Sequence, residues 1–363
     1  MKILQIISGR NVNGAVTYCK FLSEQLLSRG HELTVLCRPG GWLQEHLPAE
    51  IRVQESDLQR TPFELKRMAQ WVRQQRFDVM HTHMSRAHAF GVIMKMMTGT
   101  PVVATAHQCS LQVHWRLNDR VIANSDYTAA YQRRVNRVPA DRLDTVYCFT
   151  QLQRFRDIQA RDIQTVRGQL RLTGEEFLVG TVGDVIARKG QLYLFRAMSE
   201  IVKQVPNFKL VLLGRFKRGE PYVRKLRAIQ KREELFTRVK WLGLRDNIQD
   251  FMATFDLCVV PSVEEPLGLV ALESLAAGTP VVASQTGGLP EIITHGENGL
   301  LVPPKDPQQL AQAVIELAHN SQRRVSMGEA GREKVNEQFD PQALAAKVES
   351  IFLSLASKKR AAG

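Results

Sequence analysis

The chain has 363 residues, of which 44% are hydrophobic and 23% are charged, so it has the composition of a globular protein and not of a disordered one. A chain of this length is expected to form about two domains. The formal net charge of +13 favours polyanionic partners, which include nucleic acid, an anionic membrane and a phosphorylated substrate, but it does not choose among them.

The cysteine count and the hydropathy limit the compartment. Five cysteines without any C-x-x-C spacing argue against a zinc site and a disulfide framework, and favour the reducing cytoplasm. The first apolar run stops at Ser8 without the small-residue cleavage site of a signal peptide. No apolar stretch reaches the ~20 residues of a membrane-spanning helix. We therefore expect a cytoplasmic protein, with any membrane contact peripheral and at the inner face of the cytoplasmic membrane.

Strand-like and helix-like segments alternate along the first half of the chain. A polar loop over residues 8–14 precedes a helix expected over 15–28, and Ser125 is expected to cap a later helix. Strands are expected over residues 2–7, 31–37, 78–81, 101–105 and 121–123. Such β-α units predict a parallel sheet with helices on both faces.

The second half repeats this alternation after a polar linker over residues 151–173. Its strands are expected over residues 178–182, 209–213, 239–242, 257–260 and 280–283. The segment 215–240, rich in Lys and Arg, is either a solvated helix face or a basic docking surface. We predict an α/β fold with a Rossmann-like domain over 1–165, a second over 166–340, and a segment 341–363 with an amphipathic helix over 341–355 and a frayed tail from Ser357.

The stretch SVEEPLGLVALESLAAGTPVVAS, residues 262–284, carries the chemistry. It predicts a strand end, a short loop, a helix from about Gly268 to Gly278, and another strand. The unpaired N–H groups and partial positive charge of a helix N-terminus suit a diphosphate. Glu273, farther along the helix, can accept hydrogen bonds from a ribose diol, and Glu265 in the loop can reach sugar hydroxyls. A nucleoside-diphosphate sugar would use all three features.

The E-x7-E spacing from Glu265 to Glu273 resembles the signature of retaining glycosyltransferases, particularly glycosyltransferase family 4. The resemblance continues through AAGTP at 276–280, GGLPE at 287–291 and GENGLLVP at 296–303. Two glutamates at this spacing are common and could be surface residues on a core helix, whereas the ordered block is specific. The resemblance implies the GT-B fold: two Rossmann-like domains facing across a cleft, with the donor in the second and the C-terminal helix crossing back to the first.

The resemblance also implies which residues bind the donor. Around the helix start these are Leu267, Gly268 and Leu269, together with Glu265 and Glu273. Lys189 matches a family lysine that clamps the donor phosphates, and Leu244 lies in a segment that touches the base through its backbone.

At two positions of the predicted donor site, the sequence departs from the family pattern. Asp184 stands where the family often has arginine, and an aspartate would repel phosphate; Arg188 could supply the missing cation. The alternative is that Lys189 and Arg188 are solvated cations at a helix start. Gly14 lies in the first glycine-rich loop, where Asn13 replaces a usual glycine, and this loop could be an ordinary β-α turn.

Histidines at strand ends complete the implied site. His107 matches a family histidine that faces the sugar, with a structural histidine as the alternative. His81 and His83 are expected to be structural and to face opposite sides of their strand, so that only one can point toward the cleft. A metal-binding pair of these histidines is not expected. The predicted catalytic residues are Glu265, His107 and Lys189.

The resemblance predicts a retaining transfer of a hexose, most often from a UDP-sugar, to a hydroxyl of a lipopolysaccharide, a lipid-linked acceptor or another glycan. No Asp-x-Asp stands at a strand end, so we expect no metal and no cofactor. The alternatives are a GT-B epimerase or phosphorylase and a non-catalytic nucleotide-sugar binding protein. A nucleic-acid partner is suggested only by the charge and is not expected, because no nucleic-acid-binding motif is present.

Overall fold

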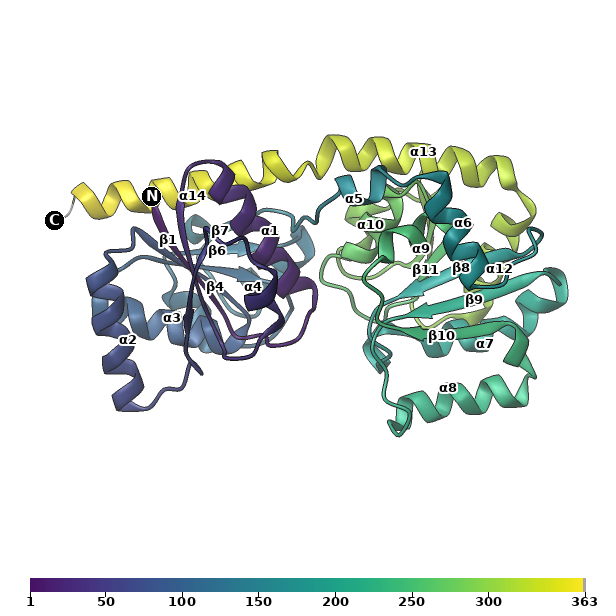
Figure 1. The fold of residues 1–363 in the computed structure, drawn as a ribbon, viewed down its shortest axis with the longest axis horizontal. Helices are drawn as coiled ribbons and strands as arrows, with labels where there is room; N and C mark the ends of the chain where they lie inside the picture. The colour runs from purple at the N-terminus through teal and green to yellow at the C-terminus, as the bar shows by residue number, and fades with distance from the viewer. Residues whose placement is uncertain (362–363) are drawn as a thin grey trace. The chain divides into compact units, whose positions relative to one another are not determined.

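The computed structural model describes residues 1–361, and its tertiary contacts divide the chain into two units (Figure 1). Unit 1 comprises Met1–Thr150 and the segment from Asp340 onwards, and unit 2 comprises Gln151–Phe339. This division precedes the expected boundary at residue 165. The reason is that α5 (Gln153–Arg156) and α6 (Ala160–Gln169) pack against α9 (Ile248–Thr254) of unit 2.

Unit 1 is built on a parallel sheet in the order β3-β2-β1-β4-β5-β6-β7. The strands are β1 (Lys2–Ile7), β2 (Glu32–Cys37), β3 (Arg52–Glu55), β4 (Val79–His83), β5 (Val102–Ala106), β6 (Arg120–Ala123) and β7 (Leu143–Thr145). The helices before residue 150 are α1 (Gly14–Ser28), η1 (Trp42–His46), α2 (Pro62–Gln75), α3 (Ser85–Thr98), η2 (Val113–Leu117), α4 (Asp126–Arg134) and η3 (Ala140–Arg142). The expected strands are present, and Ser125 caps α4 as predicted.

The last helix, α14 (Pro341–Ala361), packs on α1 and β4 of unit 1. Glu349 accepts a hydrogen bond from Arg29 Nε at 2.6 Å and is paired with His31 Nε2 at 2.7 Å. The expected return of this helix to the first domain is therefore confirmed. The helix as described includes residues 357–361, and residues 362–363 lie outside the described residues, so the fraying expected from Ser357 stays a prediction.

Unit 2 contains a second parallel sheet in the order β10-β9-β8-β11-β12-β13. The strands are β8 (Phe177–Val182), β9 (Phe208–Leu213), β10 (Val239–Gly243), β11 (Leu257–Val260), β12 (Val281–Ser284) and β13 (Gly299–Val302). The remaining helices are η4 (Ala187–Lys189), α7 (Gln191–Gln204), α8 (Pro221–Arg232), η5 (Leu235–Thr237), α10 (Leu269–Ala276), α11 (Leu289–Ile292), α12 (Pro307–His319) and α13 (Ser321–Gln338). Helices α7, α8 and α12 share one apolar core with the sheet, to which Met327 of α13 also contributes, while α6, α9, α10 and α13 contact one another on the other side.

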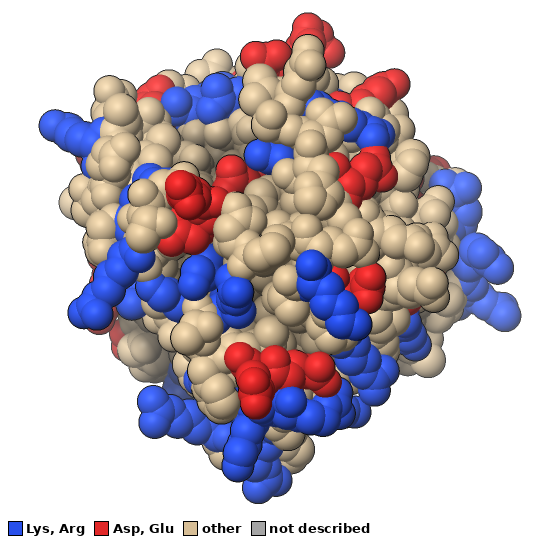
Figure 2. Space-filling model, turned by 90° about the vertical axis from the view of Figure 1, so that its right-hand side faces the viewer, with Lys and Arg blue, Asp and Glu red and all other residues tan. Residues whose placement is uncertain are grey.

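The basic segment 215–240 is centred on α8, which is amphipathic. Val223, Leu226 and Ile229 are buried in the core of unit 2. Exposed basic side chains cover the outer surface, at Arg224, Lys225, Lys231 and Arg232. Figure 2 shows Lys and Arg gathered in the lower part of its view, where Figure 1 places α8.

No helix within residues 1–361 combines the length and the hydropathy that crossing a bilayer requires. In the same part of the chain, no group of three or more His, Cys, Asp or Glu side chains is arranged to hold a metal ion.

Candidate functional site

The strand order of unit 2 reverses between β8 and β11, and open parallel sheets bind their ligands at the carboxyl edge beside such a reversal. Two loops meet there, residues 183–190 after β8 and residues 261–268 after β11. Val263 N donates to Arg188 O at 2.8 Å. Gly190 has φ +67°, and a Cβ on it would lie 1.8 Å from the carbonyl oxygen of Pro261, so only glycine permits this approach.

Glu265 is 7% exposed and is the centre of a cluster of polar side chains. Its Oε2 accepts hydrogen bonds from Lys189 Nζ at 2.6 Å and from Ser262 Oγ at 3.0 Å. Arg188 Nη1 lies 3.9 Å from Glu265 Oε1 and donates to Glu264 O at 2.9 Å. Three predicted residues, Glu265, Lys189 and Arg188, thus come together. Ser262 was missed, although a hydroxyl at the end of a strand three residues before a site carboxylate is a usable signal.

The GGLPE segment holds the backbone of Glu265 in place. Gly288 N donates to Glu265 O at 2.9 Å. Gly287 has φ +60°, and a Cβ on it would lie 1.8 Å from the same oxygen. Thr286 Oγ1 donates to Val263 O at 3.2 Å. This turn therefore has a positioning role that the sequence pattern alone did not reveal.

Helix α10 begins at Leu269, and Gly268 with φ +108° is its N-cap residue. Ala271 N donates to Gly268 O at 2.9 Å, so the N–H groups of Leu269 and Val270 are the ones without a partner within the helix. Gly268 is nevertheless buried, because a Cβ on it would meet the Leu289 side chain at 2.6 Å. Leu267 is 2% exposed, whereas Leu269 and Glu273 are half-buried. Leu289 therefore covers Gly268, at the helix start where the sequence predicted unpaired N–H groups for a diphosphate.

Asp184 does not carry an unpaired charge, contrary to the concern that it would repel a phosphate. Arg215 forms two hydrogen bonds with it, from Nε to Oδ1 at 3.0 Å and from Nη2 to Oδ2 at 2.7 Å. The sequence did not single out Arg215, because it lies 31 residues away in a long basic segment. Leu244, in the loop after β10, is 53% exposed, and its carbonyl accepts from Arg245 Nη1 at 3.3 Å.

In unit 1, Gly14 is exposed at the start of α1. Asn13 explains the missing glycine, because its Oδ1 accepts from Ala15 N at 3.0 Å and from Val16 N at 3.2 Å. This N-cap stabilises the helix and occupies two amides that a ligand would otherwise meet.

His107 is half-buried and lies in a chain of polar contacts. Its Nε2 is 3.0 Å from His83 Nδ1, and its Nδ1 is 3.6 Å from Cys148 Sγ. His83 Nε2 is in turn 2.9 Å from Gln5 Oε1. Burial lowers the pKa of His107 to about 3. At neutral pH the ring is therefore a neutral imidazole, which can form a hydrogen bond to a sugar hydroxyl but supplies no positive charge.

His81 and His83 are both fully buried, and their ring centroids are 4.2 Å apart. The expectation that they face opposite ways is wrong, because residues two apart on a strand share a face. His83 contacts His107, and His81 Nε2 lies 2.7 Å from Thr105 Oγ1.

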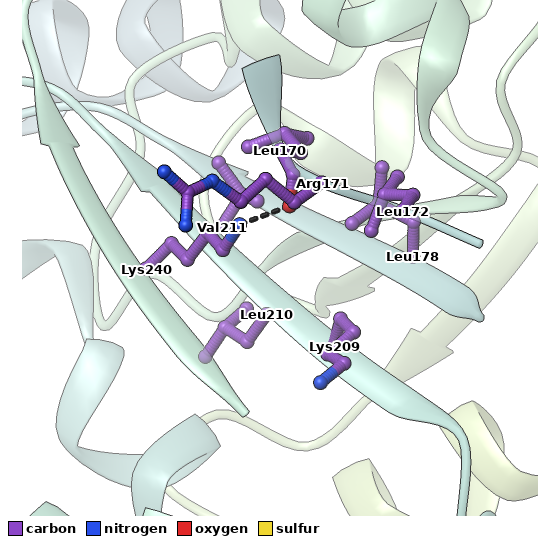
Figure 3. A pocket seen from close by; sticks show the side chains of 8 residues that line it. All are labelled: Leu170, Arg171, Leu172, Leu178, Lys209, Leu210, Val211 and Lys240. Atoms are coloured by element: carbon purple, nitrogen blue, oxygen red, sulfur yellow. Dashed lines mark hydrogen bonds between the residues drawn. The ribbon is translucent and has the colours of Figure 1, made fainter. Parts of the chain in front are cut away.

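A hollow of about 60 Å³ lies at the opposite end of the unit 2 sheet, at the beginnings of β8, β9 and β10 (Figure 3). Its lining combines leucines with basic side chains: Leu170, Arg171, Leu172, Leu178, Lys209, Leu210, Val211 and Lys240. Lys240 donates to the carbonyl of Leu170. No predicted site residue lines this hollow, which has room for only a few water molecules.

Comparison with known proteins agrees with this geometry. Residues 162–334 match the family model described as Glycosyl transferases group 1, and residues 12–154 match the one described as Glycosyltransferase Family 4. The N-acetyl-alpha-D-glucosaminyl L-malate synthase of Bacillus anthracis is 27% identical over 94% of each chain. The lipopolysaccharide core biosynthesis glycosyltransferase LpsE of Rhizobium meliloti is 27% identical over 99% of this chain and 100% of the relative.

The fold has close structural neighbours. The crystal structure of Anabaena Alr3699/HepE in complex with UDP and glucose superposes with a TM-score of 0.88 at 24% identity, covering 98% of this chain and 100% of that chain. At this identity the likeness establishes the fold.

Proposed function

Because the chain belongs to glycosyltransferase family 4 and has the GT-B fold, we propose that it transfers a hexose from a UDP-sugar to an acceptor hydroxyl with retention of anomeric configuration. The observation that carries this proposal is the cluster of Lys189, Arg188 and Ser262 around Glu265, at the strand reversal and beside the start of α10. The cluster puts cations, a carboxylate and uncapped amides within one small site, which are the groups that a diphosphate and a sugar require.

The chemistry follows from the charges of these groups. The departing diphosphate is an anion, and Lys189, Arg188 and the N-terminus of α10 stabilise it without a metal. As Lys189 turns to the phosphates, Glu265 becomes free to accept hydrogen bonds from the sugar and to stabilise positive charge at the anomeric carbon. No side-chain nucleophile is assigned: the acceptor attacks on the leaving-group face, and a phosphate oxygen takes its proton. Glu273 holds the ribose, and His107 stays a prediction as a partner of the sugar.

A screen of nucleotide sugars tests this proposal. UDP-hexoses are expected to raise the melting temperature, because a ligand at about 100 times its Kd stabilises the folded state by about 2.7 kcal/mol. Sugars of GDP and ADP serve as comparisons. Release of free UDP with an acceptor separates a transferase from an epimerase, and binding without turnover would favour a non-catalytic binding protein. Failure of every nucleotide sugar to bind would contradict the proposal.

We further propose that the acceptor is carried by an anionic membrane, as a lipid-linked glycan or a lipopolysaccharide at the inner face. Apolar side chains project from η2 and its flanks, where Leu111 is 72% and Val113 87% exposed. Lys95 Nζ donates to Leu117 O at 2.9 Å, which brings η2 against α3 beside the exposed Met96. Exposed apolar side chains with nearby Arg116 and a net charge of +13 suit insertion between anionic headgroups.

Val113→Asp is expected to reduce binding to vesicles containing phosphatidylglycerol about tenfold, since it removes apolar contact and adds a repelled charge. Sedimentation at low salt measures the effect. Val325→Asp is the matched control, because Val325 is 60% exposed on α13 of unit 2. Equal binding of the two variants would contradict this surface, and no binding of the wild-type chain would contradict membrane contact altogether.

A further inference from the structure

The Asp184–Arg215 pair lies at the carboxyl edge of unit 2 and leaves part of the guanidinium available. Asp184 accepts hydrogen bonds from Nε and Nη2 of Arg215, and the two side chains are 38% and 34% exposed. No residue of the described chain accepts a hydrogen bond from Arg215 Nη1. The hydrogen bonds to Asp184 raise the pKa of Arg215, so its charge is permanent. The outer N–H groups therefore point to a ligand or to solvent.

The backbone around this pair is held rigidly. Val185 N donates to Arg215 O at 2.9 Å, and Gly183 N donates to Leu213 O at 2.8 Å. Gly214 has φ +134°, and a Cβ on it would lie 2.1 Å from the carbonyl oxygen of Gly183. These contacts extend the β8–β9 pairing beyond the ends of both strands. Arg215 consequently loses little freedom when it binds a ligand, because its position is already set.

The loop of Arg215 lies between the two segments assigned to the donor. On one side, Lys189 Cε lies 3.4 Å from where a Cβ on Gly183 would be, and Gly183 immediately precedes Asp184. On the other side, Gly214 N donates to Gly243 O at 2.9 Å, next to Leu244. Because the strands lie in the order β10-β9-β8-β11, the loops that follow their carboxyl ends lie side by side in the same order. A ligand that extends from the Lys189–Glu265 cluster toward Leu244 must pass Arg215.

We propose that Arg215, oriented by Asp184, binds the diphosphate of the nucleoside-diphosphate sugar and takes the place of the arginine that the family often has at position 184. This inference rests on the proposed function. The carboxylate holds one edge of the planar guanidinium, and the other edge presents N–H groups in the geometry that phosphate oxygens accept. Asp184 is then a positioning residue, and its negative charge is neutralised within the pair.

Arg215→Met tests the inference, because methionine keeps an unbranched side chain and removes the charge. Binding of UDP and of UMP is measured by calorimetry for the wild type and the variant. UDP affinity is expected to fall about 10- to 100-fold, the effect of losing a charge-assisted hydrogen bond, and UMP affinity by much less. Arg218→Met is the matched control, since Arg218 is exposed in the same loop, and is expected to leave both affinities unchanged.

Unchanged UDP affinity in a folded Arg215→Met overturns the inference and leaves the proposed function intact. A wild-type chain that binds no nucleotide overturns the proposed function itself. Should Arg215→Met fail to fold, the exchange of Asp184→Arg with Arg215→Asp retains the ion pair and moves the guanidinium to position 184. It is expected to keep the wild-type UDP-to-UMP preference within about threefold, equivalent to about 0.7 kcal/mol. A folded double variant that has lost this preference contradicts the inference.

Discussion

Glu265→Gln is expected to lower the rate of sugar transfer about 10³-fold, because loss of a preorganised charge at a buried site costs about 4 kcal/mol of transition-state stabilisation. Glu265 is 7% exposed, so water does not screen its charge strongly. Its carboxylate holds Lys189 and is the group assigned to stabilise positive charge at the anomeric carbon. Glutamine keeps the size of the side chain and an oxygen that can accept from Ser262, so the loop is expected to keep its conformation.

Steady-state kinetics and calorimetry together measure this effect. The kcat is expected to fall far more than the affinity for UDP changes, because the proposed function assigns Glu265 to the sugar and not to the nucleotide. Glu264→Gln is the matched control, since Glu264 is the neighbouring glutamate and contributes only its backbone carbonyl to Arg188. A kcat within about threefold of wild type in Glu265→Gln would show that this carboxylate has no part in the chemical step.

Acidification is expected to destabilise unit 1 well before its carboxylates titrate. Burial lowers the pKa of His81 and of His107 to about 3, and burial lowers the pKa of His83 and of His88 as well. In the unfolded chain these histidines have pKa values of about 6.5, so below this pH they bind protons there, while in the folded chain they stay neutral. The contribution of these neutral histidines to the free energy of unfolding is fully present above pH 6.5 and is lost as the pH falls toward 3. At pH 5, His81 and His107 together lower the free energy of unfolding by about 4 kcal/mol relative to neutral pH.

Urea unfolding at pH 7.5 and pH 5.0, followed by tryptophan fluorescence, measures this loss. Trp42, Trp71 and Trp115 lie in unit 1, and the ring centroid of Trp115 is 4.5 Å from that of His88. The pKa values of Glu64 and Glu349 are lowered from 4.5, so these carboxylates add to the loss only at lower pH.

A histidine variant separates this effect from general acid sensitivity. His81→Gln is expected to reduce the loss between pH 7.5 and 5.0 by about 2 kcal/mol, the share of one buried histidine. His319→Gln, on the exposed end of α12, is the control and is expected to behave like the wild type. Identical pH dependence of the two variants would contradict the role of the buried histidines.

The sequence by itself determined the repeating architecture and the family, and it predicted the centre of the candidate site. Apolar runs of four to six residues between helical segments predicted the central strands, because strands buried on both faces need such runs. The short strands β3, β7 and β13 were missed. Strand β3 is largely exposed, β7 has only three residues, and the apolar residues of β13 were interpreted only as part of the motif at 296–303. The block from Pro261 to Pro303 identified Glu265 because a loop, a glycine turn and a helix start follow one another within a few residues.

Only the tertiary structure decided which distant residues meet. Lys189 lies 76 residues before Glu265, Asp184 lies 31 before Arg215, and Gln5 lies 78 before His83. The cover of Leu289 over Gly268 and the capping of α1 by Asn13 were likewise visible only in three dimensions. The physical reason is that local pattern specifies a strand or a helix, whereas the order of strands within a sheet specifies which loop ends are neighbours. That order depends on how whole β-α units pack, which no short stretch of sequence encodes.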